Sequence, residues 1–323
     1  MTAFALGTFS RPGAGPFAAL IVGESALPLR ALSSFGADDI EGVLHDWDHR
    51  LPQLEAAAAS FDRQAAFALD ELHVHAPFVP GNLYCTGANY RGHVGGMIRG
   101  DASMRAQQHQ NEDPVAIAAR VDAELERRAT TAKPYCFVKL TSCIAGPNDA
   151  LVLPKDVEKP DWELELAVVI GRKARRVCAL DAMKHVAGYA IINDITARDM
   201  VFPRESFGIG ADWLAGKCHP GFAPFGPWLV PAAQVPDVYA LDIQLRVNGK
   251  AMQQERTSDM LINIARQIEH LSNIVSLEPG DVIATGSPAG NGAMHGVFLK
   301  PGDVMEGSIS GLGKQRVSCI AEP

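Results

Sequence analysis

The chain has 323 residues, of which 47% are hydrophobic and 20% are charged, and its formal net charge at pH 7 is −8. This composition excludes a disordered chain and is typical of a globular protein with room for one large domain and a smaller one. The acidic balance argues against a nucleic-acid-binding surface. No segment is apolar over the ~20 residues that a membrane-spanning helix needs, so we expect no membrane contact.

Six cysteines are scattered along the chain without a CxxC pair, and the N-terminal segment lacks the basic start and apolar run of a signal peptide. In a chain of this size, the cysteine spacing predicts reduced thiols instead of a disulfide framework or a zinc ribbon. We therefore expect a cytoplasmic protein.

Residues 1–75 are predicted to form a small N-terminal domain. Residues 16–23 and 26–32 are short strand candidates separated by turn residues, and residues 38–60, rich in Ala and Leu, favour a helix. The proline-containing segment 75–82 has the composition of a linker.

Residues 76–323 are predicted to form the larger domain, interrupted at about 97–132 by a polar helical insertion. Asp113 and Pro114 suit the cap and the first turn of a helix. Apolar side chains then recur on one face of that helix, at Ile117, Val121 and Leu125.

Strands and turns dominate after the insertion. A helix is expected after Ser258, where apolar residues recur at helical spacing. Two Pro-Gly turns, in residues 278–286 and 300–309, each lead into a strand. The few helices among many strands predict an α+β fold built on a mixed β-sheet or roll, without regular alternation of strand and helix.

Residues 161–170, with the sequence DWELELAVVI, place two carboxylates on one face of a predicted strand. Side chains alternate along a strand, so Glu163 and Glu165 point to the same side. Two anions beside a core are costly unless a positive charge lies between them. A hard divalent cation suits such oxygen ligands, and Asp194, at the end of the next apolar run, supplies a third.

An ExE pattern by itself also occurs on a solvated strand face, where the glutamates bind nothing. The residues that follow the second apolar run favour the metal hypothesis instead. Asp194, Arg198 and Asp199 lie close together there, in a predicted turn or short helix.

These segments carry a resemblance that covers roughly residues 82–320. The chain resembles the fumarylacetoacetate hydrolase family in seven segments, in the family's order: GANYRGH (87–93), KPYCFVKLTSCIAGPND (133–149), DWELELAVVIG (161–171), GYAIINDITARD (188–199), DWLAGK (212–217), FGPWLV (225–230) and GDVIATGSPAGNG (280–292). The resemblance implies a β-roll catalytic domain, a homodimer, and a Mg²⁺, Mn²⁺ or Ca²⁺ ion held by Glu163, Glu165 and Asp194.

The resemblance also implies a catalytic base at His93, in the family motif NYxxH. The glycine-rich segment around it, residues 87–96, is expected to be a loop or a mobile lid. Neutral imidazole can take a proton from water near pH 7. Many relatives carry a carboxylate where this chain has Gly96 and a glutamine where it has Val201. The insertion offers possible replacements for the carboxylate, at Asp101, Glu112 and Asp113.

Further site residues are implied by the same likeness. Lys217 is expected at the substrate, where it would stabilise an oxyanion. Arg198 is expected to hold Asp194 or a substrate carboxylate. The remaining candidates for substrate binding are Tyr90, Lys139, Thr285 and Ser287.

The preferred hypothesis is a hydrolase that cleaves a carbon–carbon bond in a 1,3-dicarbonyl acid, such as an acylpyruvate or a fumarylacetoacetate-like acid. The cation would polarise two substrate oxygens, and His93 would activate water. The first alternative is an isomerase, decarboxylase or hydratase that acts on a 2-oxo-dienoic acid through the same enolate. The second is a metal-stabilised protein that has lost catalysis. The expected partner is a small 2-oxo or diketo acid.

Overall fold

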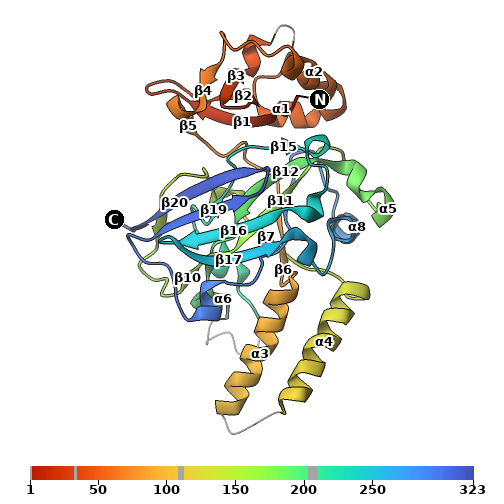
Figure 1. Cartoon of the computed structure of the whole chain (residues 1–323), viewed down its shortest axis with the longest axis vertical. Coiled ribbons are helices and arrows are strands. Elements are labelled where there is room, and N and C mark those ends of the chain that lie inside the picture. The colour runs from red at the N-terminus through yellow and green to blue at the C-terminus, as the bar shows by residue number, and fades with distance from the viewer. Residues whose placement is uncertain (1, 33–34, 108–112, 203–209) are drawn as a thin grey trace.

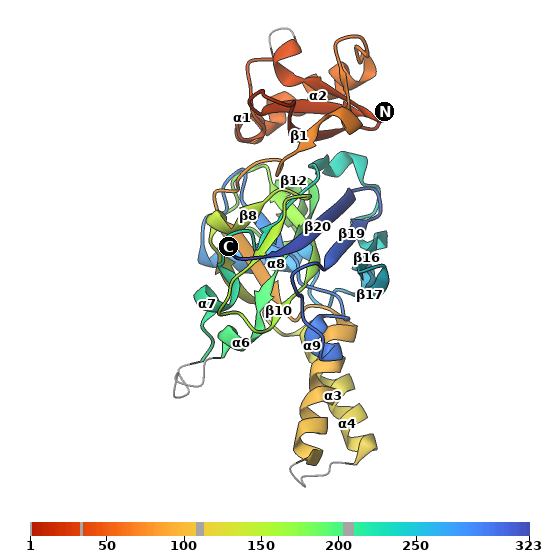
Figure 2. The same ribbon diagram turned by 90° about the vertical axis from the view of Figure 1, so that its left-hand side faces the viewer.

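The computed structural model describes residues 2–32, 35–107, 113–202 and 210–323, with residues 101–107 described by their backbone alone. Three parts lie in line: a sheet with two helices, a roll of β-sheets, and a helical hairpin (Figures 1 and 2). Strands and helices are mixed without regular alternation, so the expected α+β fold with a mixed β-sheet roll is confirmed.

The N-terminal part is a five-stranded sheet in the order β4-β3-β2-β1-β5. Its elements are β1 (Ala5–Ser10), β2 (Phe17–Val22), β3 (Ser25–Pro28), α1 (Ile40–His45), α2 (Trp47–Ala59), β4 (Phe67–Ala68) and β5 (His73–Val74). The single helix expected over residues 38–60 is two helices. The Asp39 side chain caps α1 by accepting from the Gly42 amide at 2.6 Å, and the chain turns at Asp46 before α2 begins.

The roll contains a six-stranded sheet, in the order β15-β12-β11-β18-β6-β7, and a five-stranded sheet, in the order β17-β16-β19-β20-β9. The first is made of β6 (Leu83–Gly87), β7 (Tyr135–Lys139), β11 (Leu164–Ile170), β12 (Val186–Asn193), β15 (Val230–Pro231) and β18 (Val282–Ala284). The second is made of β9 (Leu151–Leu153), β16 (Asp242–Val247), β17 (Lys250–Arg256), β19 (Val304–Ile309) and β20 (Gly313–Ala321). The two expected turn-and-strand units are therefore present as β18 and β19.

Short elements complete the roll. Two pairs of short strands are β8 (Ile144–Ala145) with β14 (Ala223–Pro224), and β10 (Pro160–Asp161) with β13 (Thr196–Ala197). The helices are α5 (Ala179–Ala182), α6 (Arg198–Val201), α7 (Trp213–Lys217), α8 (Ile264–Ile274) and α9 (Gly292–His295). The helix expected after Ser258 is α8. It begins only at Ile264, because the Asn263 side chain caps it by accepting from the Arg266 amide at 2.9 Å.

The insertion forms a hairpin of two helices, α3 (Arg91–Gln107) and α4 (Pro114–Thr130), which projects from the roll (Figure 1). Asp113 caps α4, as expected, by accepting from the Val115 amide at 3.1 Å. The segment around His93 is not the expected loop or lid, since α3 begins at Arg91 and His93 lies in its first turn. Glu112, residues 203–209 and the side chain of Asp101 lie outside the described residues.

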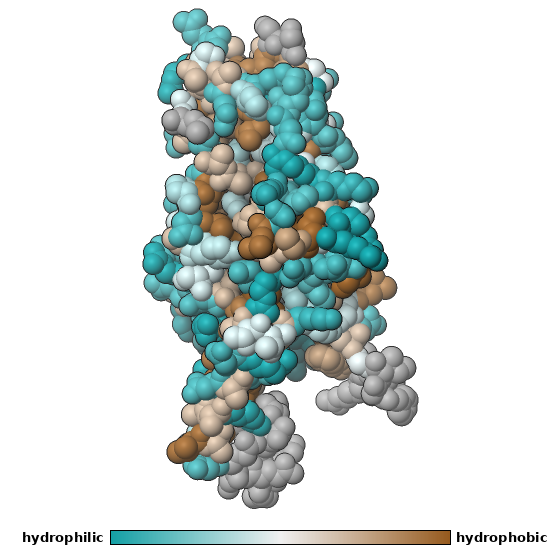
Figure 3. All heavy atoms as spheres, turned by 90° about the vertical axis from the view of Figure 1, so that its right-hand side faces the viewer, coloured by the Kyte–Doolittle hydropathy of each residue, from teal (hydrophilic) through white to brown (hydrophobic). Residues whose placement is uncertain are grey.

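The buried core is shared between the N-terminal sheet and the roll. One apolar cluster contains Leu6 and Leu20 of the sheet together with Val169 and Leu229 of the roll. On the face that Figure 3 shows, hydrophilic side chains predominate and hydrophobic side chains form small groups. Among the described residues, no helix combines the length and apolar character that crossing a membrane requires.

Candidate metal and active site

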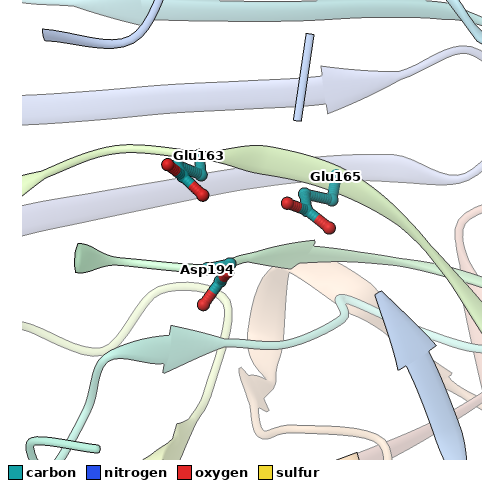
Figure 4. A group of neighbouring side chains, drawn as sticks. All are labelled: Glu163, Glu165 and Asp194. Carbon is teal, nitrogen blue, oxygen red and sulfur yellow. The ribbon is translucent and has the colours of Figure 1, made fainter. Parts of the chain in front are cut away.

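Three carboxylates meet where β11 and β12 run side by side. These strands are antiparallel with Leu164 opposite Asn193, and the Asp194 amide donates to the Glu163 carbonyl at 2.8 Å. Strand alternation puts Glu163 and Glu165 on the same face, as predicted. One carboxylate oxygen of each glutamate and of Asp194 lies within 4.8 Å of the others (Figure 4). All three side chains are buried.

Cationic side chains surround two of these carboxylates. Lys217 donates to Asp194 Oδ2 at 2.5 Å and to Glu163 Oε2 at 3.1 Å. Lys139 donates to Asp194 Oδ1 at 2.6 Å, and Arg198 Nη2 donates to Glu163 Oε1. Glu165 accepts from the Gly286 amide at 2.7 Å and has no cationic side chain bound to it among the described residues.

The pKa values follow from this arrangement. Burial by itself would raise the pKa of Glu163, but Arg198 and Lys217 outweigh it and lower that pKa to about 2. Burial would lower the pKa of Lys217, yet Asp194 and Glu163 raise it, so the lysine stays protonated. The pKa of Glu165 lies well above its usual range, because of burial and then repulsion from Asp194 and Glu163.

The residues present fit a divalent cation. The donor set consists of carboxylate oxygens, which Mg²⁺, Mn²⁺ and Ca²⁺ prefer. Glu165 is buried beside the two anions Glu163 and Asp194, and no cationic side chain binds it in the described structure. A metal cation would neutralise this excess of negative charge. We therefore regard these three residues as a candidate metal centre.

Asp161, which the sequence analysis passed over, organises one edge of the site. It is fully buried and accepts from the amides of Trp162 at 2.8 Å, Gly292 at 2.6 Å and Ala293 at 3.0 Å. It also accepts from Arg198 Nε at 2.8 Å, while the same guanidinium binds Glu163. Arg198 was expected to hold Asp194 or a substrate carboxylate. In the structure it binds Glu163 instead of Asp194.

A cavity of about 400 Å³ opens onto the carboxylates, a size within the range of small-molecule sites. Its lining includes the three carboxylates and four other expected residues or positions: His93, Arg198, Lys217 and Ser287, together with Val201. The fold therefore gathers in one hollow residues that are up to 201 positions apart in the sequence, Thr86 and Ser287 being the extremes.

His93 is half-buried on the cavity wall. Burial lowers its pKa, a shift that Glu163 opposes and Arg198 reinforces, so the ring is neutral at pH 7. Its Nδ1 is buried without a hydrogen-bond partner in the described part of the chain. Gly96, one helical turn further on, supplies no carboxylate, and a Cβ there would lie 2.3 Å from Met294 Cε, so the Met294 side chain would have to move to admit one.

Three other expected substrate-binding residues do not line this cavity in the described structure. Tyr90 and Thr285 are fully buried, and the Thr285 hydroxyl donates to the Leu166 carbonyl at 2.9 Å. Lys139 is also buried and donates to Asp194 without lining the cavity. Asp113 caps α4 at the tip of the hairpin away from the roll (Figure 1), so it does not replace a carboxylate partner for His93.

An aromatic wall, formed by Tyr135, Phe137 and Trp213, lines the cavity and was also not anticipated. The Phe137 and Trp213 rings stack at 4.6 Å and 12°, and Trp213 Nε1 donates to the Tyr135 hydroxyl at 3.0 Å. Lys217 Nζ lies 5.0 Å from the Phe137 ring centre. Arg128 of α4 lines the cavity as well. Aromatic residues 78 positions apart give no sequence signal that they will meet.

Comparisons with known proteins place the chain in a family. A family model described as "Fumarylacetoacetate (FAA) hydrolase C-terminal" matches residues 82–319. The 2,4-didehydro-3-deoxy-L-rhamnonate hydrolase of Sphingomonas sp. (strain SKA58) is 43% identical over 187 residues, which make up 57% of this chain and 64% of that protein. The chain thus aligns with slightly less than two thirds of this relative's length.

Two solved structures match almost the whole chain. Maleylpyruvate hydrolase from Sphingobium sp. SYK-6, in complex with manganese(II) ion and pyruvate, is 25% identical with a TM-score of 0.73, covering 99% of this chain and 100% of that one. The 2-hydroxyhepta-2,4-diene-1,7-dioate isomerase from Mycobacterium marinum is 26% identical with a TM-score of 0.69, covering 99% of both. The family match spans most of the sequence, and we conclude that the chain belongs to the fumarylacetoacetate hydrolase family.

Proposed function

We propose that this chain is a divalent-metal-dependent hydrolase that cleaves a carbon–carbon bond in a 1,3-dicarbonyl acid of the acylpyruvate type. The observation that carries the proposal is the buried cluster of Glu163, Glu165 and Asp194 at one cavity with His93 and Lys217. A bound Mg²⁺ or Mn²⁺ ion, or Ca²⁺, would polarise two substrate oxygens and stabilise the enolate that carbon–carbon cleavage produces.

The chain's own residues supply the proton transfers and the charge stabilisation. Neutral His93 takes a proton from water, whose oxygen then bonds to the distal carbonyl carbon. Protonated Lys217 stabilises the resulting oxyanion. The carbon–carbon bond breaks as that carbonyl re-forms, and the proton held by His93 returns to the carbanion carbon. Arg198, fixed by Asp161, keeps Glu163 anionic and in place.

The relatives support hydrolysis. The similar Sphingomonas and Sphingobium proteins are named hydrolases, and the Sphingobium structure contains manganese(II) and pyruvate. Pyruvate is the fragment that an acylpyruvate would release. Because the chain aligns with only 64% of the Sphingomonas relative, the activity of that protein is not transferred whole.

An acylpyruvate assay tests the proposal. With Mg²⁺ or Mn²⁺ present, we expect the chain to release pyruvate and the acyl acid from acetylpyruvate. Glu163→Ala and chelation of the metal should each lower the rate by at least about 100-fold. Turnover that survives both changes would contradict the role of the metal centre.

A second reaction class is favoured by Gly96 and by the similar Mycobacterium isomerase. Without a carboxylate beside it, His93 is a weaker base toward water, and the same site would then isomerise, decarboxylate or hydrate a 2-oxo-dienoic acid. Mass spectrometry of the products separates the two classes. Hydrolysis gives two fragments with one added water, isomerisation conserves mass, and decarboxylation loses carbon dioxide.

We also propose that the chain forms a homodimer and acts in the cytoplasm. Strand β7 is an edge strand of the six-stranded sheet, and it exposes Tyr135 on the side of the cavity and Val138 on its other face. An exposed apolar edge strand is a ready surface for pairing. Light scattering of the purified protein is expected to give about twice the chain's mass, and a monomer would contradict the dimer.

A further inference from the structure

The helical hairpin contributes part of the cavity wall. Met97 of α3 and Arg128 of α4 line the same hollow as the three carboxylates. The role that we assign to Arg128 below rests on the proposed function. It concerns the end of the substrate that lies away from the metal centre.

Arg128 is fixed in place by two contacts. Its Nε donates to Glu124 Oε1 at 2.7 Å, and its Nη1 donates to the Ala88 carbonyl at 2.8 Å. Ala88 also lines the cavity and adopts a left-handed backbone conformation, with φ of 50°. Nη2 has no hydrogen-bond partner among the residues that the structure describes. The side chain is 26% exposed, so much of its hydration is already lost.

The local charge leaves a net positive group at this wall. Glu124 accepts from both Arg127 and Arg128, and these hydrogen bonds lower its pKa to about 2. One carboxylate therefore faces two guanidinium groups. Arg127 is mostly exposed to solvent, whereas Arg128 turns toward the cavity.

The last turn of α4 is anchored to the roll, which keeps Arg128 at a defined place. Arg266 of α8 donates to the carbonyls of Ala129 and Ala132, the second at 2.8 Å. Val94 of α3 packs with Leu261 and Ile262 of the roll in one apolar cluster. A cationic group on a supported helix end is better positioned than one on a loop.

We propose that Arg128 binds a second anionic group of the substrate, so that this site prefers a diketo acid with a carboxylate at each end. The keto acid end would lie at the carboxylate cluster, and the second carboxylate would accept a hydrogen bond from Nη2. Charge-assisted bonds from arginine to carboxylate are strong and directional. The aromatic wall of Tyr135, Phe137 and Trp213 suits the planar enol form of the 1,3-dicarbonyl group between the two ends.

Two substrates and a pair of neighbouring arginines test this role. Succinylpyruvate carries a second carboxylate at its far end, and butanoylpyruvate ends there in a methyl group. We expect kcat/KM to be about 10- to 100-fold higher for succinylpyruvate, the range for a hydrogen bond to a charged group. Arg128→Met should raise KM for succinylpyruvate by that factor and leave kcat and the butanoylpyruvate constants nearly unchanged.

Arg127→Met is the matched control, because Arg127 binds the same Glu124 carboxylate but does not line the cavity. It should leave both substrates unaffected. An equal loss for both substrates in Arg128→Met would indicate a merely structural tie between α4 and Ala88, and would overturn the inference. So would a wild-type protein that shows no preference between the two acids.

Titration calorimetry of the Mg²⁺-loaded protein with the same two acids separates this inference from the proposed function. If neither acid is cleaved, the proposed hydrolysis fails. A selective loss of succinylpyruvate binding in Arg128→Met would then still support the role of Arg128. Equal binding of both acids by wild type and variant would overturn it.

Discussion

Glu165 differs from the other two carboxylates of the cluster in having no cation bound to it in the described structure. Lys217, Lys139 and Arg198 neutralise Glu163 and Asp194 but leave Glu165 with the Gly286 amide alone. Its raised pKa expresses the cost of burying a carboxylate beside two others. This residue should therefore report most directly on whether a divalent ion binds.

Glu165→Gln is expected to stabilise the metal-free protein at pH 7 and to remove its response to magnesium. The neutral amide ends the repulsion but is a weaker ligand. At a magnesium concentration 100 times Kd, wild type should gain about 2.7 kcal/mol in free energy of unfolding, and the variant much less. Thermal unfolding with chelator and with magnesium measures both effects. Glu255→Gln, at a half-buried carboxylate outside the cluster, should keep the wild-type response.

The same group sets a pH dependence. The folded-state pKa of Glu165 lies well above the ordinary value of 4.5 for a glutamate, so the metal-free folded protein holds a proton that the unfolded chain releases. The contribution of Glu165 to the free energy of unfolding is fully present below about pH 4.5. It is lost as the pH rises through the raised pKa of the folded state. The advantage of Glu165→Gln over wild type should therefore vanish near pH 4.5 and grow toward pH 7. A constant difference across this range would contradict the assignment.

Asp161 is a positioning residue, because it holds Arg198 against Glu163. Asp161→Asn keeps one acceptor oxygen but places an amide beside donors, which should cost about 1–3 kcal/mol of stability. We expect a lower kcat, and no further loss when Arg198→Lys is added, since both changes break one unit. Asp199→Asn is the control, because the Asp199 carboxylate accepts from the amides of Glu158 and Lys159, whereas the Arg198 guanidinium binds Asp161 and Glu163. Additive losses would refute the coupling.

At the scale of elements, the hairpin depends on its anchor for a fixed position. The C-terminal end of α4 lies nearest the roll (Figures 1 and 2), and there Arg266 donates to the carbonyl of Ala129 in α4 and to that of Ala132 just after it. The rest of the hairpin extends away from the sheets. Few contacts therefore hold the hairpin in place near the cavity. The part of the hairpin that lies farther from the roll is expected to have low local stability.

Arg266→Met is expected to loosen α4 while leaving the sheets intact. Hydrogen exchange should become at least about 10-fold faster in residues 120–132, because the last carbonyls lose their partners. Exchange in β11 and β12 should not change. Arg256→Met, which removes an exposed pair with Asp242, is the control. If exchange in α4 stays slow, the anchor is not what fixes the hairpin.

At the scale of the whole molecule, the N-terminal sheet and the roll share buried surface. Leu6 of β1 and Leu229 next to β15 exchange two backbone hydrogen bonds of 2.8 Å, and both side chains are fully buried. The apolar cluster that contains them continues into β11 and β12. Because these strands carry the carboxylates, folding of the first 75 residues is expected to support the site.

Leu229→Ala should destabilise the whole chain by about 2–5 kcal/mol, the usual loss for a buried leucine. Urea unfolding followed by circular dichroism and by tryptophan fluorescence should show one coincident transition. Leu180→Ala, at a leucine that is 94% exposed, should change little. Two separate transitions would show that the N-terminal sheet folds independently of the roll.

The sequence by itself predicted which carboxylates form the candidate metal centre, and it determined the type of most elements. Strand alternation placed Glu163 and Glu165 on one face, and the cap at Asp113 marked the start of α4, because both are local effects of backbone geometry. The likeness to the family then indicated the roll and the positions of His93 and Lys217. These features depend on residues close in sequence or on motifs kept in order.

Only the tertiary structure decided which side chains meet. In the structure, Lys217 and Lys139 bind Asp194, and Asp161 binds Arg198. Tyr90 and Thr285 lie in the core, and the segment around His93 is a helix instead of the expected lid. The tertiary structure also brought Arg128 of the insertion to the same cavity as the carboxylates. Such contacts join residues up to about two hundred positions apart, and their geometry depends on sheet order and packing, which no local pattern in a single chain specifies.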